Sequence, residues 1–123
     1  MLSEYQEQQL VVEYLELKGH KFTAIPNSTY TKSWKQKTKN RRTGLRAGFP
    51  DMVMIICGQF IAIEMKRSNG GVLSKSQRGW IEALQLANIP VRVCKGATQA
   101  IKFIQEFEKN EQIPRHDDQE TRF

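Results

Sequence analysis

Two carboxylates and one amine stand at the ends of two apolar segments in the middle of the chain. Asp51 precedes the run 52–56, and Glu64 and Lys66 end the run 59–66. A pair of carboxylates is a ligand set that Mg²⁺ accepts while it keeps several waters, which leaves room for a substrate phosphate. A nearby lysine can orient a water molecule or neutralise negative charge that develops on the phosphate. These residue types therefore indicate metal-assisted phosphate chemistry, provided that the fold brings them together.

A β-hairpin is the element that would do so. Both apolar segments have strand length, and residues 57–58 between them contain a glycine, which predicts a tight turn. A two-residue loop pairs Ile56 with Gln59. Counting back along both strands then sets Asp51 opposite Glu64, on the face that also carries the lysine two residues later. Like charges placed so destabilise a sheet unless a cation offsets them. A loop of odd length would instead turn Asp51 to the other face.

Each of these residues taken alone has a plainer explanation. An acidic residue after a proline, and a Glu-x-Lys at the end of a strand, are common as structural or solvated side chains. Their joint occurrence on one predicted hairpin, with both carboxylates on one face, favours an active site.

The motif resembles a known signature. Pro50-Asp51 followed by Glu64-Met65-Lys66 is similar to the PD-(D/E)xK pattern of Mg²⁺-dependent nucleases. The wider context of this motif resembles more narrowly the virus-type replication-repair nuclease branch, VRR-NUC. The residues that carry this narrower resemblance are 46–51, 64–66 and 73–77. This resemblance runs from about residue 3 to residue 107. It implies an α/β fold with a single-domain, restriction-endonuclease-like core, in which helices flank a mixed central β-sheet.

The resemblance also implies roles for residues outside the carboxylate pair. We expect the backbone carbonyl of Met65 to join Asp51 and Glu64 as a metal ligand. The first helix is implied to supply one more acidic ligand, for which Glu4 is the first choice and Glu7 the alternative. Gln77 is implied as a site residue, although from the residues alone it could equally cap its own helix. The expected catalytic residues are Asp51, Glu64, Lys66, Gln77 and Glu4. Mg²⁺ is the implied cofactor, with Mn²⁺ as a substitute.

Basic residues are concentrated in one segment. The chain has 19 Lys and Arg against 13 Asp and Glu, a net charge of +6, and residues 31–46 contain no acidic residue. Such a block suits a polyanion, and interleaved aromatic rings offer surfaces on which bases stack. A solvated lysine-rich loop is the alternative. The expected DNA-binding residues are Lys32, Trp34, Lys35, Lys37, Lys39, Arg41, Arg42 and Arg46, with Lys75 and Arg78 in a later helix.

The chain length of 123 residues suits one domain, expected over residues 1–109, followed by a polar tail at 110–123. The predicted helices cover about residues 3–18, 74–87 and 98–109, and the predicted strands cover 20–25, 52–56, 59–66 and 89–94. Residues 31–46 lack periodicity and are predicted to be a basic loop inserted before the hairpin. The order of elements predicts an antiparallel hairpin with a parallel neighbour.

Two further features concern the environment of the protein. Cys57 and Cys94 lie in or beside predicted strands and are expected to be buried thiols rather than a disulfide or a metal pair. The sequence shows neither an apolar run of membrane-span length nor a signal-peptide profile, so we expect a cytoplasmic protein without membrane contact. If the protein is phage-encoded, the expected location is the cytoplasm of the host cell.

Three functions fit these observations. The first is a Mg²⁺-dependent endonuclease similar to the phage-type Holliday-junction resolvases, acting as a homodimer on branched or four-way-junction DNA. The second is a nicking or restriction-like nuclease on other DNA structures. The third is a basic nucleic-acid-binding module without catalysis, which is disfavoured because a binding protein gains nothing from carboxylates that face a phosphate.

Overall fold

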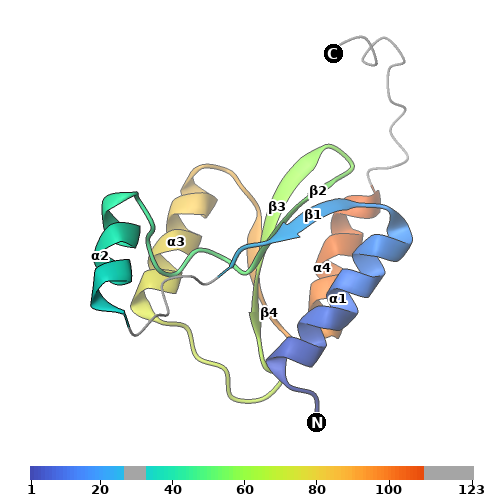
Figure 1. Ribbon diagram of the computed structural model, residues 1–123. Helices are drawn as coiled ribbons and strands as arrows, with labels where there is room; N and C mark the ends of the chain where they lie inside the picture. The colour runs from blue at the N-terminus through green and yellow to red at the C-terminus, as the bar shows by residue number, and fades with distance from the viewer. Residues whose placement is uncertain (27–32, 110–123) are drawn as a thin grey trace.

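The chain folds as one four-stranded mixed sheet between layers of helices, in a computed structural model that describes residues 1–26 and 33–109. The elements are α1 (Glu4–Lys18), β1 (Lys21–Ala24), α2 (Trp34–Arg42), β2 (Met52–Ile56), β3 (Gln59–Lys66), α3 (Lys75–Leu86), β4 (Val91–Lys95) and α4 (Ala97–Glu108). Figure 1 shows α1 and α4 on one side of the sheet and α3 on the other, with α2 next to α3. The expected tail at 110–123 lies outside the described residues.

The strand order is β1-β2-β3-β4, with antiparallel pairing of β1 with β2 and of β2 with β3, and parallel pairing of β3 with β4. The α3 helix makes the crossover that parallel pairing requires. This topology confirms the predicted fold class.

The central hairpin has the predicted two-residue turn. Cys57 and Gly58 both have positive φ, 51° and 83°, as a type I′ turn requires. Ile56 therefore pairs with Gln59, and the ladder continues to Met52 opposite Ile63. The predicted register is confirmed.

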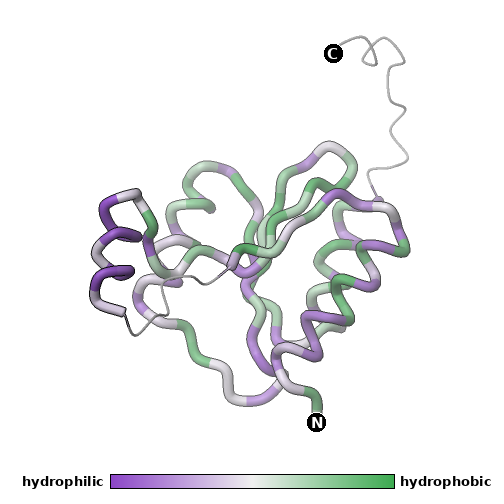
Figure 2. The backbone as a smooth tube through the Cα atoms, viewed as in Figure 1, coloured by the Kyte–Doolittle hydropathy of each residue, from purple (hydrophilic) through white to green (hydrophobic). Residues whose placement is uncertain are grey.

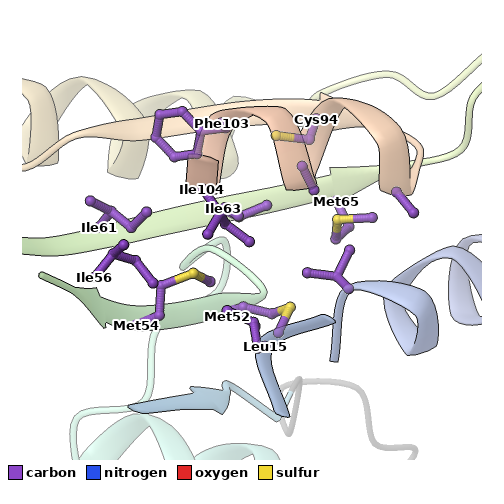
Figure 3. Close-up of a cluster of buried hydrophobic side chains, with 13 residues drawn as sticks. Leu15, Met52, Met54, Ile56, Ile61, Ile63, Met65, Cys94, Phe103 and Ile104 are labelled. Carbon is purple, nitrogen blue, oxygen red and sulfur yellow. The ribbon is translucent and has the colours of Figure 1, made fainter. Parts of the chain in front are cut away.

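Alternation along this hairpin creates two apolar layers. The larger layer packs under α1 and α4 and is shown in Figure 3; its labelled members are Leu15, Met52, Met54, Ile56, Ile61, Ile63, Met65, Cys94, Phe103 and Ile104. The smaller layer lies under α3 and consists of Ala62, Ile81, Leu84 and Val91. Each large side chain buried in this way contributes about 1.5–3 kcal/mol to the free energy of unfolding. The core therefore fixes both faces of β3, including the face that carries the candidate site.

The prediction of a basic loop over residues 31–46 is wrong, because residues 34–42 form α2. The side chain of Ser33 caps this helix by accepting a hydrogen bond from the backbone N of Gln36, at 3.1 Å. Lysine, arginine and glutamine are good helix formers. Periodicity nevertheless detects only helices with an apolar stripe, and α2 buries none of its residues; Figure 2 shows it as strongly hydrophilic.

Both cysteines are reduced thiols. Cys94 is buried as expected, and burial raises the pKa of its thiol to about 12, whereas Cys57 is only partly buried. Within the described residues, no helix has the length and apolar character needed to cross a membrane.

Candidate active site

The two carboxylates of the motif lie side by side at the end of β2. Continuing the ladder by one pair beyond Met52 and Ile63 sets Asp51 opposite Glu64, on the sheet face that α3 covers. The side chain of Asp51 turns toward β3, where its Oδ2 accepts a hydrogen bond from the backbone N of Met65 at 2.7 Å. Glu64 is almost fully buried, with 1% of its surface exposed.

An amide from α3 joins the Glu64 carboxylate to the lysine. Gln77 Nε2 donates to Glu64 Oε2 at 3.0 Å, and Lys66 Nζ donates to Gln77 Oε1 at 3.1 Å. The same Oε1 accepts from the backbone N of Ser74, the N-cap of α3, at 2.9 Å. Because two donors converge on Oε1, the amide can only present its NH₂ group to Glu64. Gln77 therefore caps its helix and also contacts the site, so the two interpretations of this residue are compatible.

The electrostatics of the pair favour a cation. Burial, followed by the negative charge of Asp51, raises the pKa of Glu64 to about 8, against the opposing charge of Lys66. Lys66 Nζ lies 3.8 Å from Glu64 Oε2. The other oxygen, Oε1, is buried and receives no hydrogen bond from any residue that the structure describes. An orphaned carboxylate oxygen beside a second carboxylate is a donor set that fits a hard divalent ion.

The backbone of Met65 adds a further oxygen to this edge. Its N–H points toward Asp51, and the N–H and C=O of one strand residue point to the same side. The carbonyl of Met65 therefore faces the end of β2, where Asp51 lies. Among the described residues, no three His, Cys, Asp or Glu side chains gather as a metal site. At this edge the motif itself brings together oxygens of Asp51, Glu64 and the Met65 carbonyl.

The structure distinguishes the two acidic residues of α1. Glu7 is 8% exposed; its Oε1 accepts from the backbone N of Ala97 at 2.8 Å, and its Oε2 accepts from Ser68 Oγ at 2.5 Å. These hydrogen bonds, Ser68 first, lower the pKa of Glu7. Glu4 lies one turn earlier, close enough for its negative charge to raise the pKa of Glu64. Glu7 thus holds α1, α4 and the end of β3 together, and Glu4 is the α1 carboxylate whose charge acts on the site.

Contacts that the sequence did not reveal fix the segment before Asp51 against α3. A Cβ atom on Gly48 would lie 2.6 Å from the carbonyl carbon of Ser76. Trp80 Nε1 donates to the carbonyl of Ala47 at 3.1 Å, and the Trp80 and Phe49 rings meet edge to face at 5.0 Å. The only sequence signals were a glycine close to the Pro-Asp motif and a tryptophan in an amphipathic helix. Neither specified a partner.

The expected DNA-binding residues occupy two exposed places. Five of the basic residues lie on α2, and Lys75 and Arg78 lie on the first turn of α3 beside the site. Arg46 has an additional structural role, since its Nη1 donates to the carbonyls of Arg41 and Leu45, both at 3.0 Å, which caps the end of α2. Lys32 lies outside the described residues.

A cleft of about 290 Å³ opens beside the carboxylate pair. It is lined by Ile25, Pro26, Gly44, Leu45, Arg46, Gly48, Phe49, Asp51, Gln77 and Trp80. Because the lining includes Asp51 and Gln77, a ligand in the cleft reaches the site directly.

Comparison with known proteins gives a consistent result. None of the curated proteins matches the chain. A solved structure titled "VRR_NUC domain protein" is 28% identical, with 89% of this chain and 90% of that chain covered and a TM-score of 0.67. The VRR-NUC domain matches residues 2–98, and nucleases of this family act on DNA and typically use a divalent metal ion. Because that match covers most of a chain whose sheet carries Asp51, Glu64 and Lys66 together, the chain belongs to the VRR-NUC family of nucleases, within the PD-(D/E)xK superfamily.

Proposed function

We propose that this protein is a Mg²⁺-dependent, structure-specific DNA endonuclease that hydrolyses phosphodiester bonds in four-way junctions, as the Holliday-junction resolvases do. The observation that carries the proposal is the pairing of the partly exposed Asp51, which lines a cleft, with the buried Glu64. Gln77 joins the Glu64 carboxylate to Lys66. Two carboxylates and a lysine held in this way bring no advantage to a protein that only binds DNA.

The site supplies oxygen ligands for one or two ions. Asp51, Glu64 and the carbonyl of Met65 would hold them, and the buried Glu64 Oε1 has an unused lone pair for this purpose. Carboxylate and carbonyl oxygens suit Mg²⁺, with Mn²⁺ as the alternative. A bound divalent ion supplies Lewis-acid stabilisation of negative charge on the scissile phosphate.

The remaining residues position the reactants. Lys66, whose Nζ lies 3.8 Å from Glu64 Oε2, orients the attacking water or neutralises the phosphate. Gln77 fixes the direction of Lys66 Nζ and of the Glu64 carboxylate at once, since it bonds to both. Pre-organisation of this kind lowers the barrier because the dipoles need not reorient during the reaction.

A cleavage assay tests the proposal. The protein is incubated with a four-way junction, a flap, a nicked duplex, a linear duplex and a single strand, each with Mg²⁺, with Mn²⁺ and with EDTA. We expect metal-dependent cleavage with a preference for the junction, and loss of cleavage in D51N and E64Q. Cleavage of the nicked or linear duplex in preference to the junction would favour the second function, a nicking or restriction-like nuclease. Binding without cleavage of any substrate would overturn the nuclease proposal.

Junction resolution also requires two active sites in one assembly. Two nearly symmetric cuts are made, and a homodimer with two-fold symmetry presents two identical sites. Sedimentation velocity at micromolar concentration, with and without junction DNA, should show a dimer. A monomer under both conditions would rule out the resolvase function and leave a nicking enzyme.

A further inference from the structure

The cations of α2 lie on two different faces of the helix. At 3.6 residues per turn, residues three, four or seven positions apart share a face. Lys35, Lys39 and Arg42 therefore form one face, which we call the outer face. Lys37 and Arg41 form another, which we call the inner face. Because α2 buries none of its residues, core packing does not determine which residue types its faces carry. The basic residues on both faces therefore need another explanation.

The inner face borders a hollow beneath α2. This hollow, of about 190 Å³, is lined by Lys37, Asn40, Arg41, Leu45, Arg46 and Ala47. Three of these residues are cations and none is acidic, whereas no residue of the outer face lines it. The hollow is therefore a basic recess on the side of α2 that faces the body of the protein.

The hollow adjoins the catalytic cleft. Leu45 and Arg46 line both, and the cleft in turn reaches Asp51 and Gln77. Arg46 is fixed at this junction, because its Nη1 holds the carbonyls of Arg41 and Leu45. A cationic path thus connects the carboxylate pair to the inner face of α2.

We infer that the DNA strand bearing the scissile phosphate leaves the active site across Arg46 and follows the inner face of α2, where Lys37 and Arg41 bind its phosphates. The inference rests on the proposed nuclease site, because the position of the scissile phosphate in that site sets where the path of the DNA strand over the protein starts. Charge complementarity identifies the occupant, since a row of cations without acidic neighbours matches a line of phosphates. The inference narrows the set of DNA-binding residues expected from the sequence: Lys35, Lys39 and Arg42 on the outer face, which do not line the hollow, add to the positive field of the protein but contact no DNA phosphate.

A matched pair of double variants tests the inference. K37Q/R41Q and K35Q/R42Q each remove one lysine and one arginine, so both lower the net charge equally, and glutamine preserves helix propensity. Affinity for a four-way junction and a linear duplex is measured by fluorescence anisotropy in EDTA over a series of salt concentrations. We expect the inner-face variant to bind roughly tenfold more weakly and to flatten the slope of log affinity against log salt by about 1.8, or 0.9 per duplex contact. The outer-face variant should retain the wild-type slope.

Two further measurements complete the test. The charge-preserving variant K37R/R41K should restore affinity, which separates loss of charge from loss of helix structure. Photoreactive thymidine analogues at successive positions on either side of the scissile bond should crosslink to residues 37–41 from one side only. Equal weakening by the two double variants, or a larger effect of the outer-face variant, would overturn the inference. Because binding is measured in EDTA, this result is independent of whether the protein cleaves DNA.

Discussion

Gly48 lies so close to α3 that a Cβ atom on it would come within 2.6 Å of the carbonyl carbon of Ser76. Gly48 also has a φ of 98°, in the left-handed region that glycine tolerates best. Each of these residues stands next to a part of the site: Gly48 three residues before Asp51, and Ser76 directly before Gln77. This one contact therefore sets the spacing between the segment that leads to Asp51 and the helix that carries the Gln77 amide.

Replacing Gly48 by alanine should damage both stability and activity. The new Cβ would meet backbone atoms, which cannot move aside as a flexible side chain can, and the strained φ adds a cost of about 1–3 kcal/mol. Gly44 is the matched control, because its φ is 103° but a Cβ there would meet nothing within 4 Å. Chemical denaturation and cleavage rates should show a larger loss for G48A than for G44A on both measures. Equal losses would mean that φ strain, rather than the contact with α3, is the reason for the glycine.

Gln77 should affect the chemical step more than DNA binding. In Q77A the Glu64 carboxylate loses its amide donor and Lys66 loses its acceptor, so kcat should fall roughly 10²-fold while the Kd for DNA stays near the wild-type value. Ser74 provides the control, since S74A also removes a capping hydrogen bond at a cost of about 1 kcal/mol but leaves the amide in place. If S74A slows cleavage as much as Q77A, the role of Gln77 is helix capping alone.

Metal should stabilise the folded protein through the carboxylate pair. A ligand that binds only the native state at 100 times its Kd adds about 2.7 kcal/mol to the free energy of unfolding. Thermal unfolding of the wild type with Mg²⁺ or Mn²⁺ should therefore shift upward from its value in EDTA, and the shift should be absent in D51N and E64Q. In EDTA at a pH above about 8, where Glu64 ionises, E64Q should be at least as stable as the wild type, because a neutral amide opposite Asp51 removes a repulsion between like charges. A metal-induced shift that persists in both variants would place the ion elsewhere.

The hairpin was predictable because its determinants are local. A two-residue turn with glycine and a strict alternation of side chains fix the register, and the register alone brings Asp51 opposite Glu64. The capping boxes of α1 and α3 are equally local, since Ser3 with Gln6 and Ser74 with Gln77 are three residues apart. These elements can therefore be predicted without information on tertiary contacts.

Other features were unpredictable because they depend on contacts between distant residues. The N-cap of α4 is Gly96, which has no side chain to cap with, and the missing acceptor comes from Glu7, ninety positions away from Ala97. No local pattern marks Glu7 for that task. The hydrophobic pattern of the sequence does not reveal α2 for a different reason. This helix is stabilised by helix propensity and by the Ser33 cap, and such a helix shows no periodic apolar residues.

Stability should depend on pH through Glu108, at the end of the sheet away from the site. Burial alone would raise the pKa of this carboxyl, but hydrogen bonds from Tyr14 and His20, both 2.6 Å long, outweigh it and lower the pKa below 4.5. Because the pKa of Glu108 is lower in the folded than in the unfolded state, the ionised carboxylate adds to the free energy of unfolding above pH 4.5. This contribution is lost as the pH falls through the folded-state pKa. E108Q should therefore lose about 2 kcal/mol at pH 7, and its difference from the wild type should vanish in acid.

The control for this titration is two residues away on the same helix. Glu106 pairs with Arg92, but both side chains are 49% exposed, and exposed pairs contribute only about 0–1 kcal/mol. Urea denaturation from pH 7 down to pH 3 should separate E108Q from E106Q. A constant difference between E108Q and the wild type across that range would show that packing, rather than the charge of Glu108, accounts for the loss.

The two acidic residues of α1 should give opposite results when each is changed to glutamine. In E7Q the N-terminus of α4 loses the anion that compensates for Gly96, so stability should fall by about 1–2 kcal/mol. In E4Q no such contact is lost, and stability should be unchanged. Because the charge of Glu4 acts on Glu64, E4Q should instead reduce metal affinity or kcat by roughly 10–100-fold. Denaturation in EDTA and cleavage over a series of Mg²⁺ concentrations measure the two effects separately, and the reverse pattern would make Glu7 the carboxylate of α1 that serves catalysis.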